Sequence, residues 1–118
     1  MSTLEVSNLN DGTTTVGTNY ITGGSAKAWA HFTTISTTTL VESLNVSSLT
    51  DNGTGSTNVN FTNNFANDDY AIGANSNDYH ATTSGTNSSS SARTVVSSSS
   101  HTAADASTIG QLVMGNLA

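Results

Sequence analysis

The chain has 118 residues, the length of one domain, and serine, threonine and asparagine make up 54 of them. Only 8% of the residues are charged and the formal net charge is −6, which argues against binding to nucleic acid or anionic membranes, because both need several cations. The absence of cysteine excludes disulfides, thiolate metal sites and cysteine catalysis, and no apolar run is long enough for a transmembrane helix.

The apolar content of the chain predicts a thin core. Leucine, isoleucine, valine and phenylalanine together number only 22. The low charge argues against disorder, and the abundant threonine, asparagine and serine favour strands joined by turns. The composition therefore predicts an all-β fold. Because subunit contacts enlarge the buried area of a domain that lacks disulfides, we also expect a homo-oligomer.

The first residues predict a hairpin. Residues 3–9 place Leu4 and Val6 on one face of a strand, and the turn-forming residues 10–12 (NDG) follow. Residues 13–21 can return as a second strand. This segment therefore predicts two short strands joined by a turn.

A break in the pattern suggests the domain organisation. The run Gly23-Gly24-Ser25 interrupts the chain before a more regular stretch. We therefore expect residues 1–20 to form an N-terminal arm or strand hairpin for attachment, and residues 21–118 to form a single β-sandwich domain. The N-terminus lacks the basic and apolar regions of a signal peptide.

Residues 26–32 alternate in character as a strand does. One set is small or apolar and the other is polar or aromatic; the sets are Ala26, Ala28, Ala30, Phe32 and Lys27, Trp29, His31. Successive side chains of a strand point to opposite faces. The alternation predicts that the first set packs against a second sheet and that the second set faces an interface or solvent.

Residues 44–61 (LNVSSLTDNGTGSTNVNF) carry the strongest hairpin signal. We expect a strand over residues 37–50, with a bulge near Ser47-Ser48 because Leu49 has the opposite parity to the apolar residues before it. The residues from Asp51 to Gly55 tolerate positive φ angles and predict a loop longer than two residues. A second strand ends near residue 62.

The rest of the chain predicts further short strands. They are expected near residues 70–74, 79–83, 92–98 and 108–114. Turns are expected at residues 63–69 and 75–77, and a Ser-rich loop at residues 84–91. Roughly eight or nine short strands separated by turns are typical of an antiparallel, jelly-roll-like β-sandwich.

Several polar residues are candidates for a metal or catalytic site. His31, His80 and His101 lack metal-ligand spacing, although one histidine per subunit could converge on a trimer axis. Calcium could bind Asp68-Asp69 with Asp78, or Asp51 with Asn52, but such residues also build turns. No nucleophile-elbow motif and no paired acids are present, so we expect no catalytic residue, metal or cofactor.

The aromatic residues allow two interpretations. Trp29 with Tyr70 and Tyr79 could form a platform on which sugars stack. A single tryptophan in a small β domain more often packs in the core or at an interface, and this is the interpretation that we favour.

Two stretches resemble a repeated module of bacteriophage structural proteins. The run Lys27-Ala28-Trp29-Ala30-His31-Phe32 matches a K-A-W-x-x-F pattern, and residues 45–55 (NVSSLTDNGTG) match the turn that follows it in that family. A V-N-F-T strand and an A-N/D-Y stretch come next. The match covers roughly residues 22–74, with a looser one over residues 106–115 (ASTIGQLVMG).

The resemblance implies an exposed virion component built as a trimeric β-sandwich without enzymatic activity. The module occurs in tail-fibre-like proteins and in short stand-alone proteins of marine and cyanobacterial phages. We therefore expect a tail-fibre or receptor-binding module, with a capsid decoration protein as the alternative. Its expected partners are itself, other virion proteins and a host surface glycan or receptor.

Two sets of residues are expected to serve these contacts. The residues expected at the trimer interface or in packing are Trp29, Phe32, Leu112 and Met114. The residues expected in loops that touch the host are Asn64, Asn67, Asp68, Asn75, Asn77 and Asn87. Loops vary without disturbing the sheets, which makes them suited to specificity.

Overall fold

The structure is a computed structural model that describes residues 1–83 and 86–118. Residues 84–85 of the expected Ser-rich loop lie outside this description. The described part contains ten strands and one short helix. The elements are β1 (Asn8–Asn10), β2 (Thr15–Gly17), α1 (Asn19–Thr22), β3 (Ala26–Thr33), β4 (Thr39–Leu44), β5 (Val46–Asp51), β6 (Ser56–Phe61), β7 (Ala71–Ser76), β8 (His80–Thr83), β9 (Ser91–Ser97) and β10 (Ile109–Met114).

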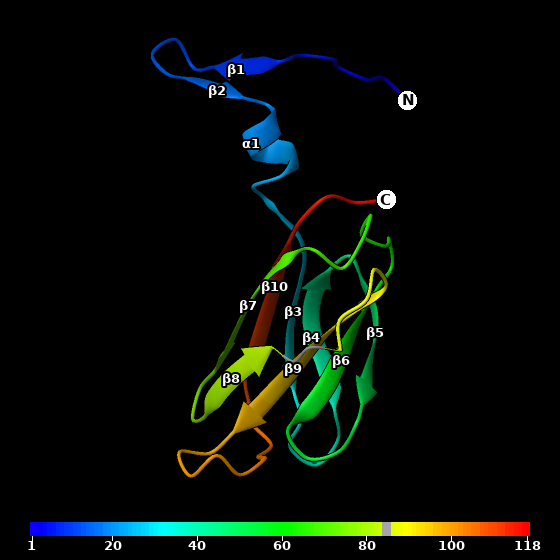
Figure 1. The fold of residues 1–118 in the computed structure, drawn as a ribbon, viewed down its shortest axis with the longest axis vertical. Coiled ribbons are helices and arrows are strands. Elements are labelled where there is room, and N and C mark those ends of the chain that lie inside the picture. Colours follow the sequence, from blue (N-terminus) through cyan, green and yellow to red (C-terminus); the bar gives the residue numbers. More distant parts are fainter. Residues whose placement is uncertain (84–85) are drawn as a thin grey trace.

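Eight of these strands form two four-stranded antiparallel sheets that pack against each other, which confirms the predicted β-sandwich (Figure 1). The first sheet has the order β4-β3-β10-β7 and is called the β10 sheet. The second has the order β5-β6-β9-β8 and is called the β6 sheet. A jelly roll also has eight strands in two sheets.

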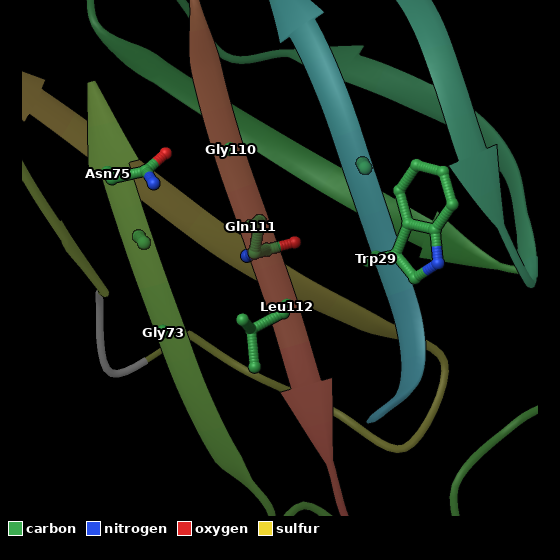
Figure 2. Close-up of a pocket in the computed structure, with 8 residues that line it drawn as sticks. Trp29, Gly73, Asn75, Gly110, Gln111 and Leu112 are labelled. Atoms are coloured by element: carbon green, nitrogen blue, oxygen red, sulfur yellow. The ribbon is translucent and has the colours of Figure 1, made fainter. Parts of the chain in front are cut away.

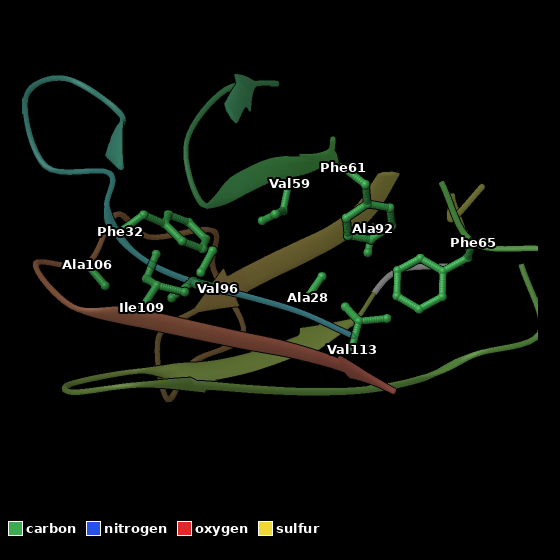
Figure 3. Close-up of a cluster of buried hydrophobic side chains, with 11 residues drawn as sticks. Ala28, Phe32, Val59, Phe61, Phe65, Ala92, Val96, Ala106, Ile109 and Val113 are labelled. Carbon is green, nitrogen blue, oxygen red and sulfur yellow. The ribbon is translucent and has the colours of Figure 1, made fainter. Parts of the chain in front are cut away.

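The alternation predicted for β3 is confirmed except at its first residue, Ala26, which is exposed. Ala28, Ala30 and Phe32 are buried, while Trp29 and His31 are only partly covered. The inner faces of both sheets supply the apolar core (Figure 3). Its members are Ala28, Ala30, Phe32, Val59, Phe61, Phe65, Ala92, Val96, Ala106, Ile109 and Val113.

The predicted strand over residues 37–50 is wrong, because this segment forms two strands in different sheets. Asn45 separates β4 from β5 with a φ of 56°, a left-handed conformation that asparagine tolerates. Its side chain is tied to the main chain of Asn63, accepting from the N–H at 2.7 Å and donating to the carbonyl at 3.0 Å. The predicted bulge is confirmed between Val46 and Ser48.

The predicted hairpin is confirmed as β5 and β6, which pair with Leu49 opposite Val59. In the turn, the Asp51 carboxylate accepts from the backbone N–H of Gly53 at 2.8 Å. Gly53 and Gly55 have φ angles of 107° and 69°. The turn therefore depends on residues that tolerate positive φ, as the sequence predicted.

The segment before β3 forms an arm that extends beyond one end of the sandwich (Figure 1). The predicted hairpin is present, since β1 pairs with β2, but the first strand covers only Asn8–Asn10 and leaves Leu4 and Val6 outside any strand. The second strand ends at Gly17, and a one-turn helix, α1, follows. The sequence signal for a strand over residues 13–21 was therefore wrong beyond Gly17. Residues 1–25 are called the arm, and the end of the sandwich beside them is called the arm end.

The turn glycines give a first prediction. A Cβ on Gly55 would lie 2.8 Å from the nitrogen and 2.9 Å from the oxygen of Ala104, whereas a Cβ on Gly53 meets nothing within 4 Å. Both substitutions to alanine introduce backbone strain of roughly 1–3 kcal/mol, and only Gly55→Ala adds an overpacking cost of roughly 1–3 kcal/mol. Urea unfolding should rank the variants wild type, Gly53→Ala, Gly55→Ala; equal losses would contradict the packing of this turn.

Gln111 is the largest buried polar side chain that lacks a hydrogen-bond partner among the described residues; the hydroxyl of Thr94 is another. Gln111 points between the sheets with Ile109 and Val113 and is only 3% exposed. Neither atom of its amide has a hydrogen-bond partner among the described residues. A buried polar group without a partner destabilises a fold by roughly 1–3 kcal/mol.

Gln111→Met should therefore stabilise the protein, because methionine has a similar volume and no amide to desolvate. We expect a gain of about 1–2 kcal/mol in the free energy of unfolding, measured by denaturant titration. Gln111→Ala is the control, since it removes the amide but leaves a cavity and should destabilise. A loss of stability in Gln111→Met would show that the amide is satisfied in solution.

Candidate interaction surfaces

The outer surface of the β10 sheet carries an apolar face. Trp29 on β3 lies directly opposite Leu44 on β4 and opposite Leu112 on β10, so all three project to the same side. Leu44 is 50% exposed, Leu112 is 42% exposed and Trp29 is partly buried. These three residues are called the apolar face.

A hollow of about 330 Å³ lies beside this face, over β10 and β7 (Figure 2). Gly73 and Gly110 line it, together with Trp29, Leu112 and Asn75. A Cβ on Gly73 would lie 3.5 Å from Cγ of Leu112, and a Cβ on Gly110 would collide with the side-chain oxygen of Asn75. The side chains of Asn75 and Leu112 therefore lie over the two glycines, and the hollow is the open space that remains beside them.

The residues expected at a trimer interface or in packing divide into two groups. The sheet brings Trp29 and Leu112 together on the apolar face. Phe32 is fully buried between the sheets, so it serves packing and is excluded from an exposed interface. Met114 lies at the last position of β10, partly buried, where it pairs with Ala71.

The outer surface of the β6 sheet is polar instead. The amide of Asn60 donates to the hydroxyls of Ser48 and Thr50 at 3.0 and 2.9 Å. Nε of Arg93 donates to the side-chain oxygen of Asn58 at 2.8 Å. This face satisfies many of its own hydrogen-bonding groups, which distinguishes it from the apolar face on the other sheet.

The residues expected to touch a host do not form one surface. Asn64, Asn67 and Asp68 lie between β6 and β7, and Asn87 precedes β9, which places these residues at the arm end. Asn77 lies between β7 and β8, at the opposite end, which is called the distal end (Figure 1). The expected turn at residues 75–77 begins too early, because β7 continues through Asn75 to Ser76.

The distal end is an ordered group of loops; the sequence predicted the turns near residues 51–55 and 75–77 but not that they gather with two further loops. It comprises residues 34–38, 52–55, 77–79 and 98–108. Several hydrogen bonds tie the last of these loops to the others, and three of them illustrate how. They run from Gly55 N to Asp105 Oδ1 at 2.9 Å, from Asn77 Nδ2 to Ser107 Oγ at 3.0 Å and from Thr34 N to the Ala106 carbonyl at 3.0 Å.

The structure separates the groups that could have held calcium. Asp68 and Asp69 lie at the arm end, whereas Asp78 lies at the distal end. Within the described part of the chain, no three histidine, cysteine, aspartate or glutamate side chains gather in one place. The carboxylate of Asp51 instead serves its turn, accepting from Gly53 N and, at 2.9 Å, from the hydroxyl of Thr38.

The structure does not bear out the alternative of an aromatic platform, which the sequence left open. The ring of Tyr70 packs against Phe65 at a centroid distance of 4.9 Å and against Phe61 at 6.0 Å. Its hydroxyl lies 2.8 Å from the carbonyl oxygen of Ser88, and burial raises its pKa. Tyr70 is thus part of the packing at the arm end.

Comparisons of the chain with protein-family models, with curated proteins and with solved structures find no match. In the residues that the structure describes, no helix is long and apolar enough to cross a membrane.

The Asp51 turn predicts a pH dependence. The N–H of Gly53 and the hydroxyl of Thr38 lower the pKa of the Asp51 carboxyl below its ordinary value of 3.8. A lowered folded-state pKa stabilises the protein above the ordinary pKa, and this contribution disappears as the pH falls through the folded-state value. The advantage of wild type over Asp51→Asn should therefore be present at neutral pH and vanish in strong acid.

Denaturant titrations of both proteins at neutral and strongly acidic pH measure this difference. Thr38→Ala is the control, because it removes one donor and keeps the carboxylate, and it should reduce the pH dependence without abolishing it. An unchanged difference between wild type and Asp51→Asn across this range would contradict the assignment.

Proposed function

We propose that this chain is a non-enzymatic structural protein of a bacteriophage virion, acting as a homotrimeric tail-fibre or receptor-binding module. The observation that carries the proposal is the difference between the two ends of the sandwich. An arm with exposed apolar side chains leaves one end, and ordered polar loops cover the other. A displayed module needs such an attachment end and a free end.

The sequence resemblance supports the same proposal. Residues 22–74, which resemble the phage module, include β3, the β5–β6 hairpin and the first half of β7. They supply the buried faces of β3 and β6 together with Trp29 on the apolar face. The resemblance therefore extends over residues that build the sandwich itself, in addition to a surface turn.

The difference between the two ends changes which residues are expected to touch the host. If the arm end faces the virion, then Asn64, Asn67, Asp68 and Asn87 face it too. The distal end then points outward and presents Asn77, Asp78 and Tyr79 beside the loop of residues 98–108. Tyr79 is 39% exposed and is the distal aromatic side chain available for contact with a sugar.

A capsid decoration protein is the second candidate, and the arm favours it. Leu4, Val6, Leu9 and Ile21 line a groove of about 420 Å³ on the arm, which could grip a segment of a shell protein. The two candidates differ in number and place on the particle. A fibre module is present in few copies per virion, whereas a decoration protein covers the head in many copies.

Competition for adsorption tests the receptor-binding proposal. Purified wild-type protein should reduce phage adsorption to host cells, and Tyr79→Ala should need at least roughly tenfold more protein for the same effect, because exposed aromatic residues dominate such contacts. Asn67→Ala, at the arm end, is the matched control and should compete like wild type.

Quantitative mass spectrometry and immunogold labelling of virions provide the second readout. A low copy number with label on the tail is the expected result. Hundreds of copies on the head would replace this proposal with the decoration protein, and absence from the virion would reject both.

A further inference from the structure

The folded chain exposes more surface than a compact domain of its size. Its accessible area is 6946 Å², whereas a compact 12.0 kDa monomer exposes roughly 6,000 Å². The excess, roughly 950 Å², is similar to the roughly 800 Å² that each partner contributes to a standard protein interface. The radius of gyration, 16.3 Å, also exceeds the roughly 13.5 Å expected for this length.

Much of this exposed surface is apolar and lies on the arm. The exposed large apolar side chains of residues 2–25 are Leu4, Val6, Leu9, Val16, Tyr20 and Ile21, and none of the residues in α1 is buried. Two three-residue strands and a one-turn helix are too short to be stable alone in water. The arm therefore needs a partner surface to hold its structure.

The apolar face of the β10 sheet is the matching surface on the same chain. It offers Trp29, Leu44 and Leu112, and the adjoining hollow can accept one inserted side chain. The arm projects beyond the sandwich and does not fold back over its own face (Figure 1). Only another molecule can cover that face.

We propose that the arm of each copy packs on the apolar face of a neighbouring copy of this chain. One such contact covers the groove of the arm and the exposed side chains of the sheet together.

The contact is heterologous, since an arm meets a face. Each copy contributes one arm and receives another, so a closed assembly is a ring with cyclic symmetry. Three copies satisfy this geometry in the expected trimer. The inference concerns the isolated protein and stands or falls independently of where the protein sits on a virion.

Disulfide trapping tests the contact directly, because the chain has no cysteine of its own. Leu4→Cys and Leu112→Cys each place one thiol on an exposed position, 80% and 42% accessible in the wild type. The two variants are mixed, one of them labelled with heavy nitrogen, and oxidised mildly. Thr82→Cys, on the polar outer face of the β6 sheet, replaces Leu112→Cys in the control mixture.

The expected product is a disulfide between Leu4→Cys of one copy and Leu112→Cys of another, identified by mass spectrometry of the labelled peptides. Its yield should exceed that of the control mixture at least roughly tenfold. Disulfides formed mainly between two Leu4→Cys copies would show that arms pair with arms, and those between two Leu112→Cys copies that faces pair with faces. Either result, or a yield no higher than the control, overturns the proposal.

A charged substitution provides an independent readout. Leu112→Asp should weaken association at least roughly tenfold in sedimentation experiments, because it places a carboxylate in the apolar contact. Thr82→Asp adds the same charge outside the contact and should leave association unchanged. Circular dichroism confirms that both variants keep the fold, and equal association of the two variants would contradict the proposal.

Discussion

The space between the β10 sheet and the β6 sheet is filled, among the described residues, by seven large apolar side chains and four alanines. The aromatic rings of Phe61 and Phe65, 4.8 Å apart, close this core at the arm end, and Phe32 fills it towards the distal end (Figure 3). By contrast, thirteen large apolar side chains are exposed. Since apolar burial is the main source of stability, the division of these side chains between the core and the surface limits the stability of a single copy.

The two outer surfaces of the sandwich differ in how well their side chains are satisfied. On the β6 sheet, Asn58 and Asn60 bond to neighbouring side chains, so this surface needs no partner. On the β10 sheet, Trp29 and Leu112 stay partly open to water. Because the arm and this face share the same chemistry, the proposed contact between copies would cover both, and it would leave the distal loops uncovered.

The sequence predicted the features that follow from local alternation and turn chemistry. The faces of β3, the β5–β6 hairpin and its bulge belong to this class. Alternation cannot show where a chain passes from one sheet to the other, so the crossing at Asn45 was missed. It also cannot show that Tyr70 turns inward, since that depends on Phe61 and Phe65 from elsewhere in the chain.

Further copies of the chain are proposed to cover its exposed apolar surface. Sedimentation equilibrium of the purified wild-type protein over a wide concentration range measures this most directly. The account predicts a single species with three times the 12.0 kDa mass of one chain, which dissociates only on dilution. A mass of 12.0 kDa that persists at the highest concentration would contradict it.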